Sequence, residues 1–448
     1  MDQFRNFIVK FWKSPTRWVM VITFAGMGLS LLFHAVLIPR YLGLSETADA
    51  LIASLKVVLL FDIVIREGAK FSLVPLFINE ARQKNSEDFN LVTNGILNFS
   101  IIVGLLCMLL IEVCADWIAY VLLLLLPNSS IVTRSEMIMF LRLTAPLIVF
   151  GSASTILGAV LNSQKHFKTV ALRNALPPGI ASLAFLLLLG TEQLAHYVAI
   201  AYTCGFLTYF VWLFIGVKRT GHRYMLTWIS SDVLHSLKNT ISLPTMGFAI
   251  RQITARLLVE VFLVGKLGKG AITLYNSAFR IFSAIQTLIG ISVATTGLPN
   301  MTEEITEENK QQFRHTLMGN IRTVLFIATP ISLSLIFGSS LIAQFLFGDN
   351  KFSEQSIQQI SQLLFCLSFA TVFFCLIPVL NAGLYAQRAF GYVFRNMVTM
   401  AVLNFIIALG LVSVWGLMGI AIAVSLTAVI AVVNLTYLLQ KTGVSLFK

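Results

Sequence analysis

Apolar runs of about 20 residues recur along the chain, and short polar segments separate them. Residues 100–111 (SIIVGLLCMLLI) and 403–426 (LNFIIALGLVSVWGLMGIAIAVSL) are examples. A helix of about 20 apolar residues crosses roughly 30 Å of hydrocarbon and satisfies its own backbone hydrogen bonds there. The pattern predicts an all-α polytopic membrane protein with about twelve transmembrane helices. These helices are expected over residues 17–39, 47–80, 90–112, 135–162, 167–190, 194–217, 238–265, 270–301, 313–338, 354–386, 391–414 and 416–440.

The composition agrees with this prediction. Of 448 residues, 57% are hydrophobic and 12% are charged, and the mean hydropathy is +0.84. A soluble domain carries roughly 25% charged residues, so this chain cannot cover itself with a water-facing surface. The net charge of +12 could suggest a nucleic-acid partner. In a membrane protein, however, lysine and arginine first set the orientation of the spans, and we expect no nucleic-acid partner.

The spans fall into two sets of six on either side of a polar connector. We therefore expect five regions. They are an interfacial N-terminal helix (1–16), an N-lobe (17–217), a cytoplasmic connector (218–237), a C-lobe (238–440) and a cytoplasmic tail (441–448). Two short apolar segments, 116–127 (DWIAYVLLLLLP) and 340–350 (SLIAQFLFGDN), are predicted as separate short helices on the membrane face.

The two sets of spans resemble one another in sequence. A shift of 223 aligns Gln164 with Gln387 and the phrase around them, QKHFKTVALRN with QRAFGYVFRN. A shift of 224 matches Pro75 with Pro299. A shift of 225 places Gly43 on Gly268. Matches at nearly one offset indicate a tandem duplication of a six-helix unit. Because the unit has an even number of spans, the copies would be parallel repeats around a central cavity.

Basic residues crowd one set of predicted loops. That set contains Arg17, Lys168, Arg173, Lys218, Arg219, Arg223, Lys310, Arg388 and Lys441, whereas the opposite loops hold few, such as Arg40, Arg134 and Lys269. Positive charge favours the cytoplasmic side, so both termini and both copies of the repeated phrase are predicted to be cytoplasmic. The basic residues of the phrase either fix the topology and touch anionic headgroups or contact the substrate directly.

Ionisable residues inside predicted spans are the candidate functional residues, because burying a charge in a membrane is costly. The second span carries Asp49, Lys56, Asp62, Arg66 and Glu67. The first, seventh and eighth spans add His34, Arg251, Arg256, Glu260 and Arg280.

Four of these charges form two possible pairs at helical spacing. Asp62 with Arg66 and Arg256 with Glu260 are each four residues apart, and such pairs could simply fasten helices together. Arg251 and Arg280 have no acidic residue at that spacing. Guanidinium groups in a cavity suit a phosphate-bearing anion, which they bind bidentately.

Several phrases resemble the lipid II flippase (MurJ/MviN) family, within the superfamily that also contains multidrug (MATE) exporters. They are residues 40–56 (RYLGLSETADALIASLK), 67–77 (EGAKFSLVPLF), 158–167 (GAVLNSQKHF), 274–299 (LYNSAFRIFSAIQTLIGISVATTGLP) and 380–390 (LNAGLYAQRAF). The phrases lie in both halves and keep the order of the family. By position, Arg280, Asp49, Lys56 and Glu67 match charged residues of the family.

The resemblance implies both an activity and some departures from the family pattern. It implies a flippase that moves a polyprenyl-pyrophosphate-linked glycan, lipid II or a relative, to the outer leaflet of the bacterial inner membrane by alternating access. Arg251, Arg256, Arg280, Arg66 and Lys56 would bind the diphosphate. His34, Asp49, Asp62, Glu67 and Glu260 would serve the cavity, gating or coupling. Well-known members have arginines where this chain has Gly28, His34 and Asp62, and they add two further helices.

Two other functions stay open at this point. A cation-coupled multidrug exporter on the same fold would favour a cavity dominated by carboxylates, and this one is basic. A membrane enzyme would need placed acid–base residues, usually on a large outer loop. We expect no enzyme activity, no metal and no cofactor, although Na⁺ or H⁺ could couple transport. The expected partners are the lipid-linked substrate and membrane lipids, and we expect a monomer. The chain has no Walker A motif that would use ATP directly.

Overall fold

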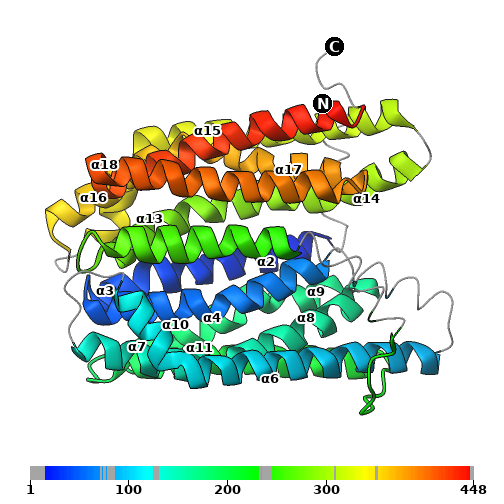
Figure 1. The fold of residues 1–448 in the computed structure, drawn as a ribbon, viewed down its shortest axis with the longest axis horizontal. Helices are drawn as coiled ribbons and strands as arrows, with labels where there is room; N and C mark the ends of the chain where they lie inside the picture. Colours follow the sequence, from blue (N-terminus) through cyan, green and yellow to red (C-terminus); the bar gives the residue numbers. More distant parts are fainter. Residues whose placement is uncertain are drawn as a thin grey trace. The chain divides into compact units, whose positions relative to one another are not determined.

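The computed structural model confirms the all-α fold (Figure 1). It describes residues 16–70, 73, 77, 86–124, 131–164, 166–231, 234, 245–306, 309–348 and 352–443. All regular structure in these ranges is helical. The predicted interfacial helix over residues 1–16 lies almost wholly outside them.

The chain forms two compact units. The first contains residues 1–33, 61–118 and 135–242, and the second contains residues 34–60, 119–134 and 243–448. The first half of α4 (Glu46–Lys70) thus packs with the C-terminal half of the chain. The sequence prediction divided the chain at the connector instead, and those five regions stay a prediction.

The first unit is built from helices whose apolar faces meet around α8. Its main elements are α2 (Thr16–Leu31), the end of α4, α6 (Ser86–Leu124) up to Ile118, α7 (Ile131–Thr144) from Ser135, α8 (Leu147–Ser163), α9 (Phe167–Ala171), η2 (Leu172–Asn174), α10 (Leu176–Leu187) and α11 (Leu194–Arg219). α11 packs against α8 and α10. Phe77, Leu157, Val160, Tyr209 and Leu213 are buried in one core cluster, to which α8 and α11 contribute apolar side chains.

The second unit begins in the first span and continues after the connector. Its elements are η1 (Leu32–Leu37), α3 (Ile38–Leu42), the start of α4, η3 (Ile253–Leu263), α13 (Ala271–Gln286), η4 (Thr287–Ile291), α14 (Ser292–Thr306), α15 (Lys310–Phe347), α16 (Glu354–Ser368), α17 (Thr371–Ala386) and α18 (Phe390–Lys441). α18 is broken at Gly416, where φ is 55°. Glycine tolerates this left-handed conformation, and the break lies at the predicted boundary between two spans.

The helix boundaries repeat at the offset that the sequence predicts. α6 and α15 begin 224 residues apart and contain 39 and 38 residues. Gly43 and Gly268 both have positive φ (70° and 118°), and so do Gly221 and Gly443 (both 86°). In the repeated phrase, one backbone N–H bonds back five residues in each copy: His166 to Leu161 at 2.8 Å, and Ala389 to Leu384 at 2.9 Å. The local geometry therefore agrees with a tandem duplication.

The prediction of two separate short helices on the membrane face is wrong. α6 continues unbroken through Asp116 to Leu124, and α15 continues through Ser340 to Phe347. Residues 116–124 and 340–347 contain no proline, and the chain gains one backbone hydrogen bond for each residue added to an existing helix. Each long helix spans about 58 Å at about 1.5 Å per residue, so it extends well past the hydrocarbon core.

The described residues contain seven helices that are long and apolar enough to cross a membrane. The number rises to nine if two bent pairs, Phe167–Asn174 with Leu176–Leu187 and Glu354–Ser368 with Thr371–Ala386, each count as one span. Parts of the predicted spans 47–80 and 238–265 lie outside the described residues. The number of twelve spans therefore stays a prediction.

The start of the connector is not a free loop. Residues 221–231, which we name the strap, run along the beginning of α6. Asn94 donates its side-chain N–H to the carbonyl of Arg223 at 2.8 Å, and Asn98 donates to the carbonyl of Thr227 at 3.0 Å. Asn94 and Asn98 are buried, so the strap satisfies two amides that would otherwise be costly at a membrane boundary. Gly95 allows this approach, because a Cβ there would lie 3.0 Å from the carbonyl oxygen of Trp228.

We expect the strap to detach at acidic pH. The imidazole Nε2 of His222 lies 2.9 Å from Asn94 Oδ1, and burial lowers the pKa of His222 below its ordinary value of 6.5. A lowered folded-state pKa means that the neutral form stabilises the docked strap. This contribution is complete above about pH 6.5 and is lost as the pH falls. Hydrogen exchange of residues 221–231 should therefore quicken between pH 7.5 and pH 5.5.

The matched control is His222→Gln, because glutamine can donate to Asn94 without titrating. This variant should show the same exchange at both pH values after correction for intrinsic exchange rates. If it retains the full pH response of the original chain, His222 is not the titrating group.

Candidate substrate-binding site

The candidate site lies within the second unit, on the four elements that carry most of the predicted charges. They are η1, the start of α4, η3 and α13. η1 and η3 are π-helical segments, and they fall at corresponding positions of the first and seventh predicted spans. π-Helical turns are rare and often occur at functional sites. His34 lies in η1, and Arg256 and Glu260 lie in η3.

A buried ion pair joins two of the predicted residues across helices. The ammonium of Lys56 on α4 lies 2.8 Å from Glu260 Oε2, and the two side chains are 3% and 11% exposed. The sequence analysis offered Arg256 as the partner of Glu260. Instead, Arg256 Nε donates to Gln252 Oε1 at 2.8 Å, one turn earlier on its own helix. The carboxylate therefore neutralises a lysine that is 204 residues away in sequence.

Positive charge dominates the surroundings of this pair. Arg256, Arg280 and Lys56 all act electrostatically on His34, and both arginines act on Lys56 as well. Three cations therefore lie near two carboxylates among the described residues, Glu260 and Asp49, and Asp49 is also within electrostatic range of Lys56. The backbone carbonyl of His34 accepts a bond from Asn276 at 3.4 Å, which ties η1 to α13. We refer to His34, Lys56, Arg256, Glu260 and Arg280 as the cationic cluster.

Asp49 holds the start of the helix that carries Arg280. Its carboxylate accepts bonds from the backbone N–H of Gly270 (2.8 Å) and of Thr273 (2.9 Å), and from the Thr273 hydroxyl (2.6 Å). The first N–H groups of a helix have no intrahelical partner and carry partial positive charge, so a carboxylate is well placed there. Asp49 thus caps α13 from another helix. Its predicted part in gating or coupling stays a prediction.

The remaining predicted residues divide between the two units. In the first unit, buried Asp62 forms an ion pair with Arg173, not the one with Arg66 that helical spacing suggested. Arg173 comes from the repeated basic phrase, and its guanidinium lies 5.9 Å from the ring of Tyr209. Gly151 makes room for this pair, because a Cβ there would overlap Asp62 Oδ1.

The other members of the predicted set are less informative about a ligand. Arg66 is half-buried and lies within electrostatic range of Tyr209. In the second unit, the guanidinium of Arg251 lies 5.1 Å above the ring of Phe248. The side chain of Glu67 falls outside the described part of the structure. Within the described ranges, no group of three His, Cys, Asp or Glu residues could hold a metal ion.

Fold and site together define the class of the protein. Repeated sets of membrane-spanning helices and a cationic cluster that is partly buried are typical of a multi-pass transporter. Among solved structures, one described as "Lipid II flippase MurJ, inward closed conformation" matches with a TM-score of 0.79 at 21% identity, covering 94% of this chain and 87% of that one. An inward-facing multidrug resistance MATE transporter matches with a TM-score of 0.77 at 12% identity and 94% coverage of both chains.

The family is shown by the sequence. The family model "Lipid II flippase MurJ" matches residues 38–448, and the chain belongs to this family. The lipid II flippase MurJ of Burkholderia cenocepacia is 22% identical over 80% of this chain and 70% of its own length. The probable lipid II flippase MurJ of Thermotoga maritima is 24% identical over 90% of this chain and 81% of its own length. The resemblance drawn from the sequence phrases is thereby confirmed.

Proposed function

We propose that this protein moves lipid II from the inner to the outer leaflet of the bacterial inner membrane by alternating access. The observation that carries the proposal is the family match over residues 38–448. The cationic cluster supports it, because the substrate carries a diphosphate between its lipid and its glycan. A transporter of this kind is not an enzyme, since no covalent bond is made or broken.

Arg256 and Arg280 are the residues that we assign to the diphosphate. Both lie in the cationic cluster, where they act electrostatically on His34 and Lys56. A guanidinium binds phosphate oxygens through two parallel N–H bonds, which an ammonium cannot do. Arg251 and Arg66 are further candidates for the same head group. The glycan would occupy the polar cavity, and the polyprenyl tail would stay in lipid.

The direction of transport follows from charge. An inside-negative membrane potential favours outward movement of an anion by roughly 2.3 kcal/mol per charge per 100 mV. We place both termini on the cytoplasmic side, from the distribution of lysine and arginine. We propose a monomer and leave Na⁺ or H⁺ as candidate coupling ions, with His34, Asp49, Asp62 and Glu67 as the groups through which an ion would act.

The competing function is export of organic cations, which the fold likeness to a MATE transporter would allow. The charge of the cluster argues against it, because like charges repel a cationic drug. The test is reconstitution of the full chain into vesicles with fluorescent lipid II in one arm and ethidium in the other. We expect exposure of lipid II on the far leaflet and no ethidium transport. Ethidium transport without lipid II movement would overturn the proposal.

A further inference from the structure

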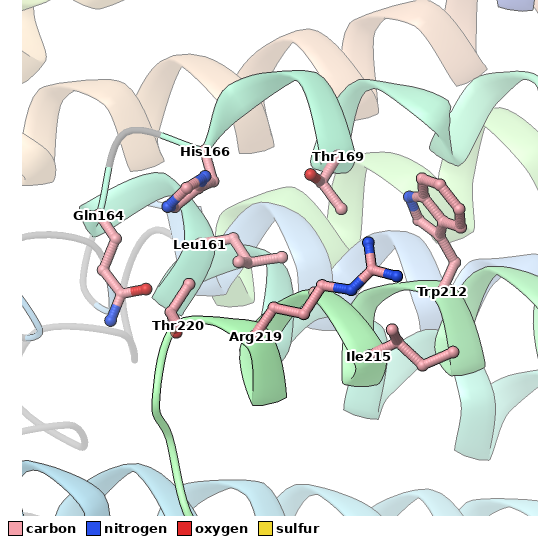
Figure 2. Close-up of a pocket in the computed structure, with 9 residues that line it drawn as sticks. Leu161, Gln164, His166, Thr169, Trp212, Ile215, Arg219 and Thr220 are labelled. Atoms are coloured by element: carbon pink, nitrogen blue, oxygen red, sulfur yellow. The ribbon is translucent and has the colours of Figure 1, made fainter.

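A groove of about 470 Å³ lies in the first unit, between the end of α8, the short helix α9 and the last turns of α11. Its lining includes Leu161, Gln164, His166, Thr169, Trp212 and Arg219. Figure 2 shows the side chain of Arg219 extending into the groove, with its guanidinium between Thr169 and Trp212. None of the predicted diphosphate-binding residues lines this groove.

The groove lies at the level of lipid headgroups. Two candidate spans, Arg134–Ser163 and Leu194–Arg219, both end beside it. α11 has 26 residues and is about 39 Å long, so its last turn passes beyond a hydrocarbon core of roughly 30 Å. One face of α11 carries Trp212, Ile215 and Arg219 at helical spacing. The first two are exposed apolar side chains, and Arg219 is an exposed cation nearer the end of the helix. Tryptophan favours this interfacial depth.

Two polar groups in the lining lack a partner within the described part of the chain: one is a cation without an ion pair, and the other is a buried oxygen without a hydrogen bond. It contains no carboxylate, and no described residue forms an ion pair with Arg219, so the groove suits an anion. Gln164 Oε1 is buried and has no hydrogen-bond partner among the described residues. A buried carbonyl oxygen needs a donor, because leaving it unpaired costs free energy. In Figure 2, Gln164 lies at the opposite end of the groove from the Arg219 guanidinium, so an anion bound to Arg219 lies beside Thr169 and Trp212 and not at Gln164.

We propose that this groove binds the phosphate of an anionic phospholipid of the inner leaflet. The phosphate lies on the guanidinium of Arg219, and an acyl chain follows Trp212 and Ile215. In the second repeat, Lys441 corresponds to Arg219, but Asn434 stands in place of Trp212 and offers no interfacial aromatic ring, so we assign the groove to the first repeat only. This proposal does not depend on which substrate the protein transports.

The test is lipid binding to the purified full chain by native mass spectrometry, with phosphatidylglycerol and phosphatidylcholine as probes. We expect a preference for phosphatidylglycerol and a loss of about tenfold in its affinity in Arg219→Gln, the value of a charge-assisted hydrogen bond. The matched control is Lys218→Gln, which removes the same charge from an exposed neighbour that does not line the groove. Equal losses in the two variants would mean diffuse electrostatic attraction and would overturn the site.

A further arm distinguishes a lipid from a free anion. Inorganic phosphate at millimolar concentration should not displace the lipid. Displacement by phosphate alone would mean a free-anion site and would contradict lipid docking.

Discussion

Arg280→Ala and Arg256→Ala should each reduce lipid II translocation by about 100-fold or more, while the protein still inserts and folds. The expected size is that of removing one charge-stabilising donor from a functional site. Arg280→Lys should reduce lipid II translocation less than Arg280→Ala does, because the charge remains and only the bidentate geometry is lost. The measurement is the initial rate of lipid II exposure in vesicles, normalised to the amount of folded protein.

The control for this series is Arg322→Ala on α15. Arg322 is an exposed arginine of the same unit, and it should retain normal transport. If Arg256→Ala and Arg280→Ala transport as well as Arg322→Ala does, the cationic cluster does not bind the transported head group. If all three lose transport equally, the loss reflects general positive charge and not this site.

Glu260→Ala should destabilise the protein by about 3–5 kcal/mol, because it leaves the Lys56 ammonium buried without its carboxylate. The double variant Lys56→Met with Glu260→Leu should recover most of that loss, since an apolar pair of similar volume avoids both desolvation costs. Thermal unfolding in detergent measures both variants.

An exposed ion pair supplies the comparison for this prediction. Arg142 Nε lies 3.8 Å from Glu112 Oε2, with side chains 56% and 34% exposed, so Glu112→Ala should cost less than about 1 kcal/mol. A double variant of Lys56 and Glu260 that is as unstable as Glu260→Ala would contradict the account. That result would mean that the two residues stabilise the unit by packing and not by neutralising one another.

The fold was largely predictable because its signals are local. Apolar length indicates a spanning helix, and a repeated offset indicates a duplicated unit. The helix break at Gly416 was also readable, since it falls between two apolar runs. The ends of α6 and α15 could not be predicted, because no local signal in the sequence marks where a helix leaves the hydrocarbon. The docking of the strap was not predicted, because its hydrogen bonds with Asn94 and Asn98 join residues that are 129 positions apart in the sequence.

The members of the cluster were predictable, but their pairing was not. A charge within a span is visible in the sequence, so His34, Lys56, Arg256, Glu260 and Arg280 could all be named. Helical spacing can only propose partners on the same helix, whereas Lys56 reaches Glu260 and Arg173 reaches Asp62 from 111 residues away. Such pairs depend on the packing of helices. The role of Asp49 as a cap for α13 has the same origin, because its donors lie more than 220 residues further on.

The most direct test of the central claim, that the cationic cluster holds a diphosphate, compares two ligands on the same protein. One is lipid II, and the other is an analogue with the same tail and glycan joined by an uncharged linker. The account predicts that the full chain binds lipid II at least tenfold more tightly and that Arg280→Ala removes this preference. Equal affinity of the original chain for both ligands would contradict the account.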